Sequence, residues 1–150
     1  MSDVMKRALA ARVEELPTAA GPIAVDAVPM DILEGVRDAL LSGETHYTDR
    51  PGMRELREKV AATLGRAAEE IVITTGDREA RFVIRLAFGE TPEDVDIIIG
   101  NWDEVPGLES FRVGYVAAPK EKAAKLRSWK QALSICTAAP SQRAVLVALK

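Results

Sequence analysis

The chain alternates short apolar runs, rich in β-branched residues, with longer segments in which apolar residues recur at helical spacing. Three runs, at residues 71–75, 95–99 and 112–118, have the length and composition of buried strands. The segments with helical spacing are residues 3–16, 30–41, 53–64, 77–88, 119–133 and a last one that begins at 140. An alternation of this kind predicts a compact α/β domain.

Glycine and proline stand where the predicted helices should end or begin. Gly65 follows the last apolar residue of one helical segment, and Pro119 opens the longest one. With 150 residues the chain has the length of one domain. We therefore expect residues 1–150 to form a single domain, in which 1–28 are an N-terminal helix and connector and 29–150 are the core.

The composition excludes several classes of protein. A net charge of -3 and a pI near 5.3 give no electrostatic reason to expect nucleic acid or an anionic membrane as a partner. The single cysteine, Cys136, and the single histidine, His46, exclude an internal disulfide and a structural zinc site. No apolar run approaches the ~20 residues of a membrane span, and the N-terminus lacks the apolar stretch of a signal peptide. We expect a soluble cytoplasmic protein without a metal ion.

Residues 74–77 (Thr-Thr-Gly-Asp) stand where a predicted buried strand passes into a helix. Free backbone N–H groups and the helix dipole make such a junction favourable for an anion. In the other interpretation Asp77 caps its own helix, and its carboxylate competes with an incoming phosphate. The spacing alone identifies no reaction.

Two blocks of sequence carry a more specific pattern. Residues 45–57 read Thr-His-Tyr-Thr-Asp-Arg-Pro-Gly-Met-Arg-Glu-Leu-Arg, and residues 71–80 read as a strand that ends in T-x-G-x-x-E-A. The second block, residues 111–119 (Phe-Arg-Val-Gly-Tyr-Val-Ala-Ala-Pro), is followed by a long helical segment and by Pro-Ser-Gln at 140–142. In this order the motifs resemble those of class I/II aminotransferases, pyridoxal-phosphate-dependent enzymes of fold type I. That family commonly reads H-Y-T-x-x-x-G-x-x-E-L-R and R-V-G-Y-x-x-A-P.

The resemblance implies an internally deleted and C-terminally truncated relative of these enzymes. A full-length aminotransferase carries a long further segment between the positions of Gly89 and Val95, and a small domain after that of Lys150. The segments that remain imply an α/β fold with a small mixed three-stranded sheet flanked by helices. The strand at 112–118 is expected in the middle of this sheet, antiparallel to its neighbours. The deletion exposes a new edge strand at 95–99, whose isoleucines need cover.

The lysine that binds pyridoxal phosphate in these enzymes has no counterpart. Aligned without gaps back from Arg112, the position of the family's lysine falls on Glu104. A rival register matches Asp103 to the aspartate that holds the pyridine nitrogen. The sequence has no lysine between Lys59 and Lys120. Because transamination needs an amine that forms a Schiff base, and a carboxylate cannot condense with an aldehyde, we expect no catalytic residue.

The motif match retains residues that surround the cofactor phosphate in the family. They are Tyr47, which in the family reaches across from the partner subunit, and Thr75, Gly76, Asp77, Asp103 and Arg112. Arg112 can grip a phosphate bidentately. Alternatively, it pairs with Asp77, Asp103 or Glu104. We expect a carboxylate as its partner, because a buried cation without one costs several kcal/mol.

The function implied is that of a non-catalytic aminotransferase-like protein, a dimeric binding or interaction module with no cofactor expected. One alternative is a module that binds pyridoxal phosphate or another small phosphate. The other is an active aminotransferase, which transfers amino groups between amino acids and 2-oxo acids. The resemblance also implies a homodimer formed through the N-terminal helices and the loop around Tyr47.

Overall fold

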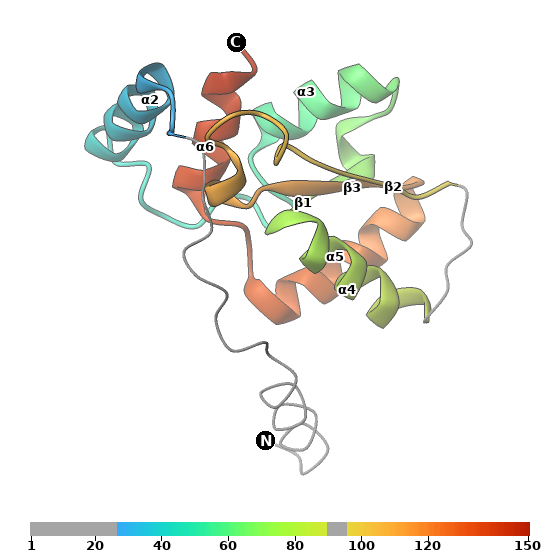
Figure 1. The fold of residues 1–150 in the computed structure, drawn as a ribbon. Coiled ribbons are helices and arrows are strands. Elements are labelled where there is room, and N and C mark those ends of the chain that lie inside the picture. Colours follow the sequence, from blue (N-terminus) through green and yellow to red (C-terminus); the bar gives the residue numbers. More distant parts are fainter. Residues whose placement is uncertain (1–26, 90–95) are drawn as a thin grey trace, which may run out of the picture.

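The computed structural model describes residues 27–89 and 96–150. Within them the chain forms five α-helices and three strands (Figure 1). In chain order these are α2 (Met30–Leu41), α3 (Arg54–Leu64), β1 (Ile71–Thr74), α4 (Gly76–Phe88), β2 (Ile98–Asn101), β3 (Gly114–Ala117), α5 (Lys120–Ser134) and α6 (Ala139–Ala148). The helix expected at 3–16 lies outside the described residues.

The three strands form one sheet in the order β1-β3-β2. Ala117 of β3 lies opposite Ile71 of β1 on one side and opposite Ile98 of β2 on the other. The central position of the 112–118 strand and its antiparallel direction are therefore confirmed. Both pairings are antiparallel, so the sheet has no parallel pair, although we predicted a mixed one. The reason is that β1 and β2, which run in the same direction, are separated by β3.

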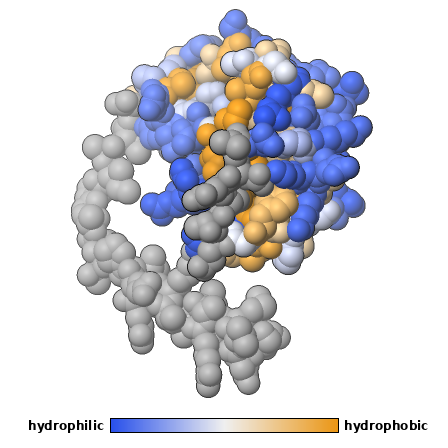
Figure 2. Space-filling model, turned by 90° about the vertical axis from the view of Figure 1, so that its right-hand side faces the viewer, coloured by the Kyte–Doolittle hydropathy of each residue, from blue (hydrophilic) through white to orange (hydrophobic). Residues whose placement is uncertain are grey.

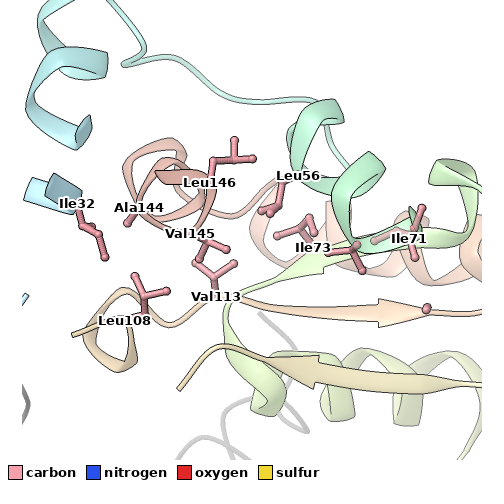
Figure 3. Close-up of a cluster of buried hydrophobic side chains, with 12 residues drawn as sticks. Ile32, Leu56, Ile71, Ile73, Leu108, Val113, Ala144, Val145 and Leu146 are labelled. Carbon is pink, nitrogen blue, oxygen red and sulfur yellow. The ribbon is translucent and has the colours of Figure 1, made fainter. Parts of the chain in front are cut away.

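Helices cover both faces of the sheet. In Figure 1, α2, α3 and α6 lie above it, and α4 and α5 lie below it. The upper core is a cluster that includes Leu56, Ile73, Val113 and Val145 (Figure 3). The lower core brings together buried side chains of the sheet, α4 and α5, namely Val72, Ala80, Val83, Ile84, Ala87, Val116, Ala118, Ala123 and Leu126. Each fully buried Leu, Ile or Val side chain stabilises the fold by about 1.5–3 kcal/mol.

The strands differ from the predicted runs in their bounds. The strand expected at 95–99 lies further along the chain, at Ile98–Asn101. Its register with β3 places Gly100 opposite Tyr115. An ideal Cβ on Gly100 would overlap Cζ of Tyr115, so the aromatic ring occupies the space of a side chain at position 100. The strand expected at 112–118 starts only at Gly114, because Arg112 has a left-handed φ of 52° that ends the extended run.

The two sequence blocks meet in space. The buried side chain of Gln142 in α6 accepts a hydrogen bond from the Met53 N–H at 2.7 Å and donates to the Thr137 carbonyl at 2.7 Å. It also donates to the Thr48 hydroxyl at 3.1 Å. Burial makes these hydrogen bonds costly to lose. The 45–57 segment is thereby held against the end of the chain that carries the second block.

Candidate functional site

The candidate site lies where β1 ends and β3 begins. These two points lie at the same edge of the sheet, because the strands are antiparallel and Thr74 pairs with Gly114. An ideal Cβ on Gly76 would lie 3.9 Å from Nη2 of Arg112, and one on Gly114 would lie 2.7 Å from the carbonyl carbon of Gly76. Close approach of backbone therefore brings Arg112 to the first residue of α4. We call Thr75, Gly76, Asp77 and Arg112 the cup residues.

Several hydrogen bonds fix the N-terminus of α4. The buried Thr74 hydroxyl donates to the Gly76 carbonyl at 2.9 Å, and the Thr75 N–H donates to Oε2 of Glu79 at 2.5 Å. The carboxylate of Asp77 lies 3.5 Å from Nε of Arg81, one turn along the helix. The first N–H groups of a helix have no partner within it, and its dipole favours negative charge there. One of these donors is already taken by Glu79.

Arg112 does not have the carboxylate partner that we expected. Its side chain is exposed, and within the described residues no acidic oxygen lies within the 4.0 Å that defines an ion pair. The expectation was wrong for two reasons. Asp77 pairs with Arg81 instead, and Asp103 and Glu104 lie exposed in the turn after β2. The Arg112 guanidinium therefore faces solvent beside the N-terminus of α4.

The remaining predicted residues lie outside the cup residues. Tyr47 is 79% exposed and lines a cavity of about 700 Å³ between the end of α2 and the segment 136–140, together with His46 and Cys136. Asp103 donates its N–H to Oδ1 of Asn101 at 3.1 Å. No hydrogen bond or ion pair among the described residues joins Tyr47 or Asp103 to Arg112.

Sequence reasoning missed an ion pair beneath the N-terminus of α4. The Lys130 side chain is completely buried, and its Nζ lies 3.0 Å from Oε2 of Glu79 and 3.0 Å from the Ser134 hydroxyl. The Ser134 hydroxyl donates to Oε1 of Glu79 at 2.6 Å. Burial opposes ionisation of Glu79. The hydrogen bonds from Ser134 and Thr75 and the charge of Lys130 outweigh it, so the pKa of Glu79 lies below its ordinary value.

The signal for this cluster was present in the sequence but weak. Lys130 falls on the apolar face of its helix, in line with the buried Ala123 and Leu126. A lysine at a core position needs a partner, and the sequence does not say which acid supplies it. Glu79 is 51 residues away along the chain.

The cup residues fit the phosphate group of pyridoxal phosphate but not the chemistry of its aldehyde. The exposed guanidinium of Arg112, the side-chain-free Gly76 and the helix N-terminus fit a phosphate group. Neither position that the motif assigns to the family's lysine carries an amine, because the sequence has no lysine from residue 60 to residue 119, and the nearby Lys130 is held in its ion pair with Glu79. The site therefore fits a phosphate and does not fit the covalent chemistry of the cofactor.

The described part of the chain has neither a metal centre nor a membrane-spanning helix. No group of three or more His, Cys, Asp or Glu side chains there could hold a metal ion. None of the helices at residues 27–89 and 96–150 has the length and apolar character needed to span a bilayer.

Comparison with known proteins gives a consistent result. No family model matches the chain. It is 30% identical over 94 residues to an aspartate/prephenate aminotransferase of Thermus thermophilus, a match that covers 59% of this chain and 24% of that protein. It is 41% identical over 49 residues to an aspartate aminotransferase of Thermococcus kodakarensis, covering 33% of this chain and 14% of that protein. The chain thus matches about a quarter or less of the length of these curated relatives.

Solved structures share the fold over nearly the whole chain. A mutant aspartate aminotransferase of Thermus thermophilus superposes with a TM-score of 0.75 at 16% identity, covering 93% of this chain and 70% of that one. The aspartate aminotransferase of Rhizobium meliloti gives a TM-score of 0.73 at 16% identity, covering 100% of this chain and 68% of that one. The chain is thus similar in sequence to part of curated aminotransferases and shares the fold of solved aminotransferase structures, and it spans only part of their length.

Proposed function

We propose that the chain is a non-catalytic aminotransferase-like protein that acts in the cytoplasm as a dimeric binding or interaction module. One observation carries the proposal: neither register of the motif supplies an amine, since both positions are exposed carboxylates, Asp103 and Glu104. Lys130, whose partner Glu79 also binds the Thr75 N–H, is buried and ion-paired. An amine that is completely buried and held by a carboxylate is not accessible to an aldehyde.

A second candidate function is favoured by the exposed guanidinium of Arg112. With no carboxylate beside it among the described residues, this side chain is free to bind a small phosphate, inorganic or part of pyridoxal phosphate, over the N-terminus of α4. Such binding requires no covalent bond. It would make the protein a phosphate-binding module rather than an enzyme.

Dimerisation is proposed on the exposed apolar side chains of one surface. Leu40, Leu41 and Tyr47 are exposed at the end of α2 and in the following loop, and Leu40 and Tyr47 line the cavity of about 700 Å³ beside the segment 136–140. Apolar surface of this kind, clustered rather than scattered, favours a protein–protein contact. The resemblance implies that the same loop meets the partner subunit.

Absorbance spectroscopy tests the proposal that the protein is not catalytic. The purified protein should be colourless, and after incubation with pyridoxal phosphate it should show neither aldimine absorbance nor transfer of an amino group from aspartate to a 2-oxo acid. Borohydride reduction followed by peptide mass spectrometry provides the control for a weak adduct. A pyridoxyl group trapped on any lysine of this chain would overturn the proposal.

A further inference from the structure

The outer edge of β2 is open. In the order β1-β3-β2 this strand pairs only with β3, and in the described chain no backbone hydrogen bond of residues 98–101 goes anywhere else. The opposite edge of the sheet is different, because the Ile73 N–H of β1 donates to the Pro51 carbonyl at 2.8 Å. β2 also lacks the proline, lysine or bulge that usually protects an edge strand. It therefore offers a row of backbone donors and acceptors to another strand.

A cavity lies beside this edge on the upper face of the sheet. It measures about 350 Å³ and is lined by residues of α3, among them the cation Lys59, by Leu149 near the end of the chain, and by the aromatic residues Trp102 and Tyr115. Gly100 contributes no side chain there, and Ile98 on the same face is 37% exposed. On the lower face, Ile97 and Ile99 pack into the core with α4 and α5. Figure 2 views the end of the molecule where β2 begins and shows a band of apolar side chains running down it.

The charged side chains that directly precede and follow β2 along the chain are acidic. Residues 90–104 include six acidic side chains and no lysine or arginine. Three of the acids belong to the described residues: Asp96 before the strand, and Asp103 and Glu104 after it. All three are exposed, and in the described part of the chain none of their carboxylates has a basic partner within 4.0 Å. Arg66 lies near Asp96, where its Nη2 donates to the backbone carbonyl at 3.2 Å. An apolar strand flanked by free carboxylates at both ends matches a partner strand with cations at both ends.

The same charges disfavour a second copy of this chain as the partner strand. Two β2 strands paired antiparallel about their centres would set Asp96 of each copy opposite Asp103 of the other. Like charges directly opposite each other destabilise a strand pair. The observations therefore favour a partner other than the chain itself.

We propose that the open edge of β2 binds an extended peptide segment as a fourth strand. Its alternate apolar side chains would enter the cavity beside Trp102 and Tyr115, and lysine or arginine residues at its ends would face Asp96, Asp103 and Glu104. This inference rests on the proposed binding function and deepens it, because it names the chemical class of the partner and the strand that receives it.

The test uses the full chain and two labelled nonapeptides. One alternates valine and threonine and carries two lysines at each end; the other is identical but carries glutamates in their place. The lysine peptide should raise fluorescence anisotropy on binding, and the glutamate peptide should bind about tenfold more weakly or worse. In the Asp103→Lys/Glu104→Lys variant this preference should reverse. Equal affinity of both peptides for the wild type would overturn the proposal.

Hydrogen exchange tests whether the peptide pairs with β2. The lysine peptide should slow exchange of the outward-facing amides of residues 98–101, and a version with proline at alternate positions should neither bind nor slow them. Ile98→Lys should lower affinity for the lysine peptide about tenfold, and its circular dichroism should match the wild type because Ile98 is partly exposed. Exchange that is already slow without peptide would overturn the proposal, because the edge would then be occupied by the chain itself.

A dimer that Ile98→Lys dissociates would also overturn it, in favour of a second copy at this edge. The two proposals fail separately. Absence of peptide binding together with absence of an aldimine leaves the non-catalytic function standing. A trapped aldimine in a protein that binds the peptide overturns only the non-catalytic function.

Discussion

Arg112 combines a left-handed backbone, with φ of 52°, and an exposed guanidinium beside Gly76. A non-glycine residue in this region is uncommon, and such positions often mark a functional site. Because the side chain makes no ion pair in the described chain, its charge contributes little to folding and is available to a ligand.

If a phosphate occupies this position, the melting temperature of the wild type should rise with millimolar phosphate. Arg112→Ala should abolish that rise, because ligand that binds only the folded state stabilises it by mass action. The substitution itself should change the free energy of unfolding by no more than about 0.5 kcal/mol. Arg78→Ala, which removes another exposed arginine near the start of α4, is the matched control and should keep the phosphate effect. Equal behaviour of both variants in a thermal scan would contradict this assignment.

Lys130 has a structural role that substitution can measure. Lys130→Met should lower the free energy of unfolding by about 3 kcal/mol, because it leaves the largely buried carboxylate of Glu79 without its cation. Adding Glu79→Gln should restore part of the loss, and chemical denaturation of the single and double variants gives the coupling. If the double variant is less stable than the sum of the two single effects predicts, loss of the ion pair is not the cause of the destabilisation by Lys130→Met.

The pH dependence of stability follows from the same pair. The pKa of Glu79 is lower in the folded than in the unfolded chain. Its contribution to stability is therefore complete above the unfolded value, about 4.3, and is lost as the pH falls through the folded value. As the pH falls below about 4.3, the wild type should lose stability more steeply than Glu79→Gln does. Parallel curves for the two proteins would show that Glu79 does not titrate as the structure implies.

At this scale the sequence allowed prediction of local neighbours but not of distant ones. The motif brought Arg112 and Gly76 together correctly, because a strand that ends beside a helix N-terminus fixes both backbones. The expected carboxylate partner of Arg112 was wrong, because Asp77 has a closer cation one helical turn away in Arg81. The Lys130–Glu79 pair joins two helices through tertiary packing, which no local pattern encodes.

At the scale of elements, the apolar pattern located every described helix and strand. The ends of the helices were the most predictable feature, because Gly65 takes the left-handed conformation that ends α3. The bounds of β2 and β3 were less predictable, because hydrophobicity does not reveal register. The register is set by side-chain packing, in particular by the ring of Tyr115 over Gly100.

This packing can be tested at Gly100. Gly100→Ala should lower the free energy of unfolding by about 1–3 kcal/mol, because the new Cβ would overlap the Tyr115 ring, which also packs at 5.4 Å from Trp102. In a Tyr115→Ala background the same change should cost less, since the space is then free. Urea denaturation of the wild type, the two single variants and the double variant measures the loss of unfolding free energy caused by Gly100→Ala in each background. An equal loss in both backgrounds would mean that the backbone conformation, not the Tyr115 ring, requires glycine.

At the scale of the whole molecule, two surfaces of the described residues are candidates for contact with a partner: the apolar surface around the end of α2 and the open edge of β2. They differ in charge. The first adjoins Arg143, whose guanidinium binds Glu44 at 2.7 Å and Glu55 at 3.7 Å, so charges there are already paired. The second is flanked by carboxylates without partners in the described chain. Paired charges around an apolar centre suit a contact between identical copies, whereas charges of one sign suit a partner of opposite charge.

We therefore expect a homodimer that uses the surface around the end of α2. Light scattering at tens of micromolar should give twice the 16.3 kDa mass of the chain. Leu41→Glu, at a side chain that is 80% exposed, should yield a monomer with an unchanged circular dichroism spectrum, because a carboxylate in an apolar interface is costly while the isolated fold loses no contact. Leu86→Glu, on the exposed face of α4, is the matched control and should remain dimeric, as should Ile98→Lys. A monomeric wild type would contradict the homodimer, and a dimer that Leu86→Glu dissociates but Leu41→Glu does not would place the interface elsewhere.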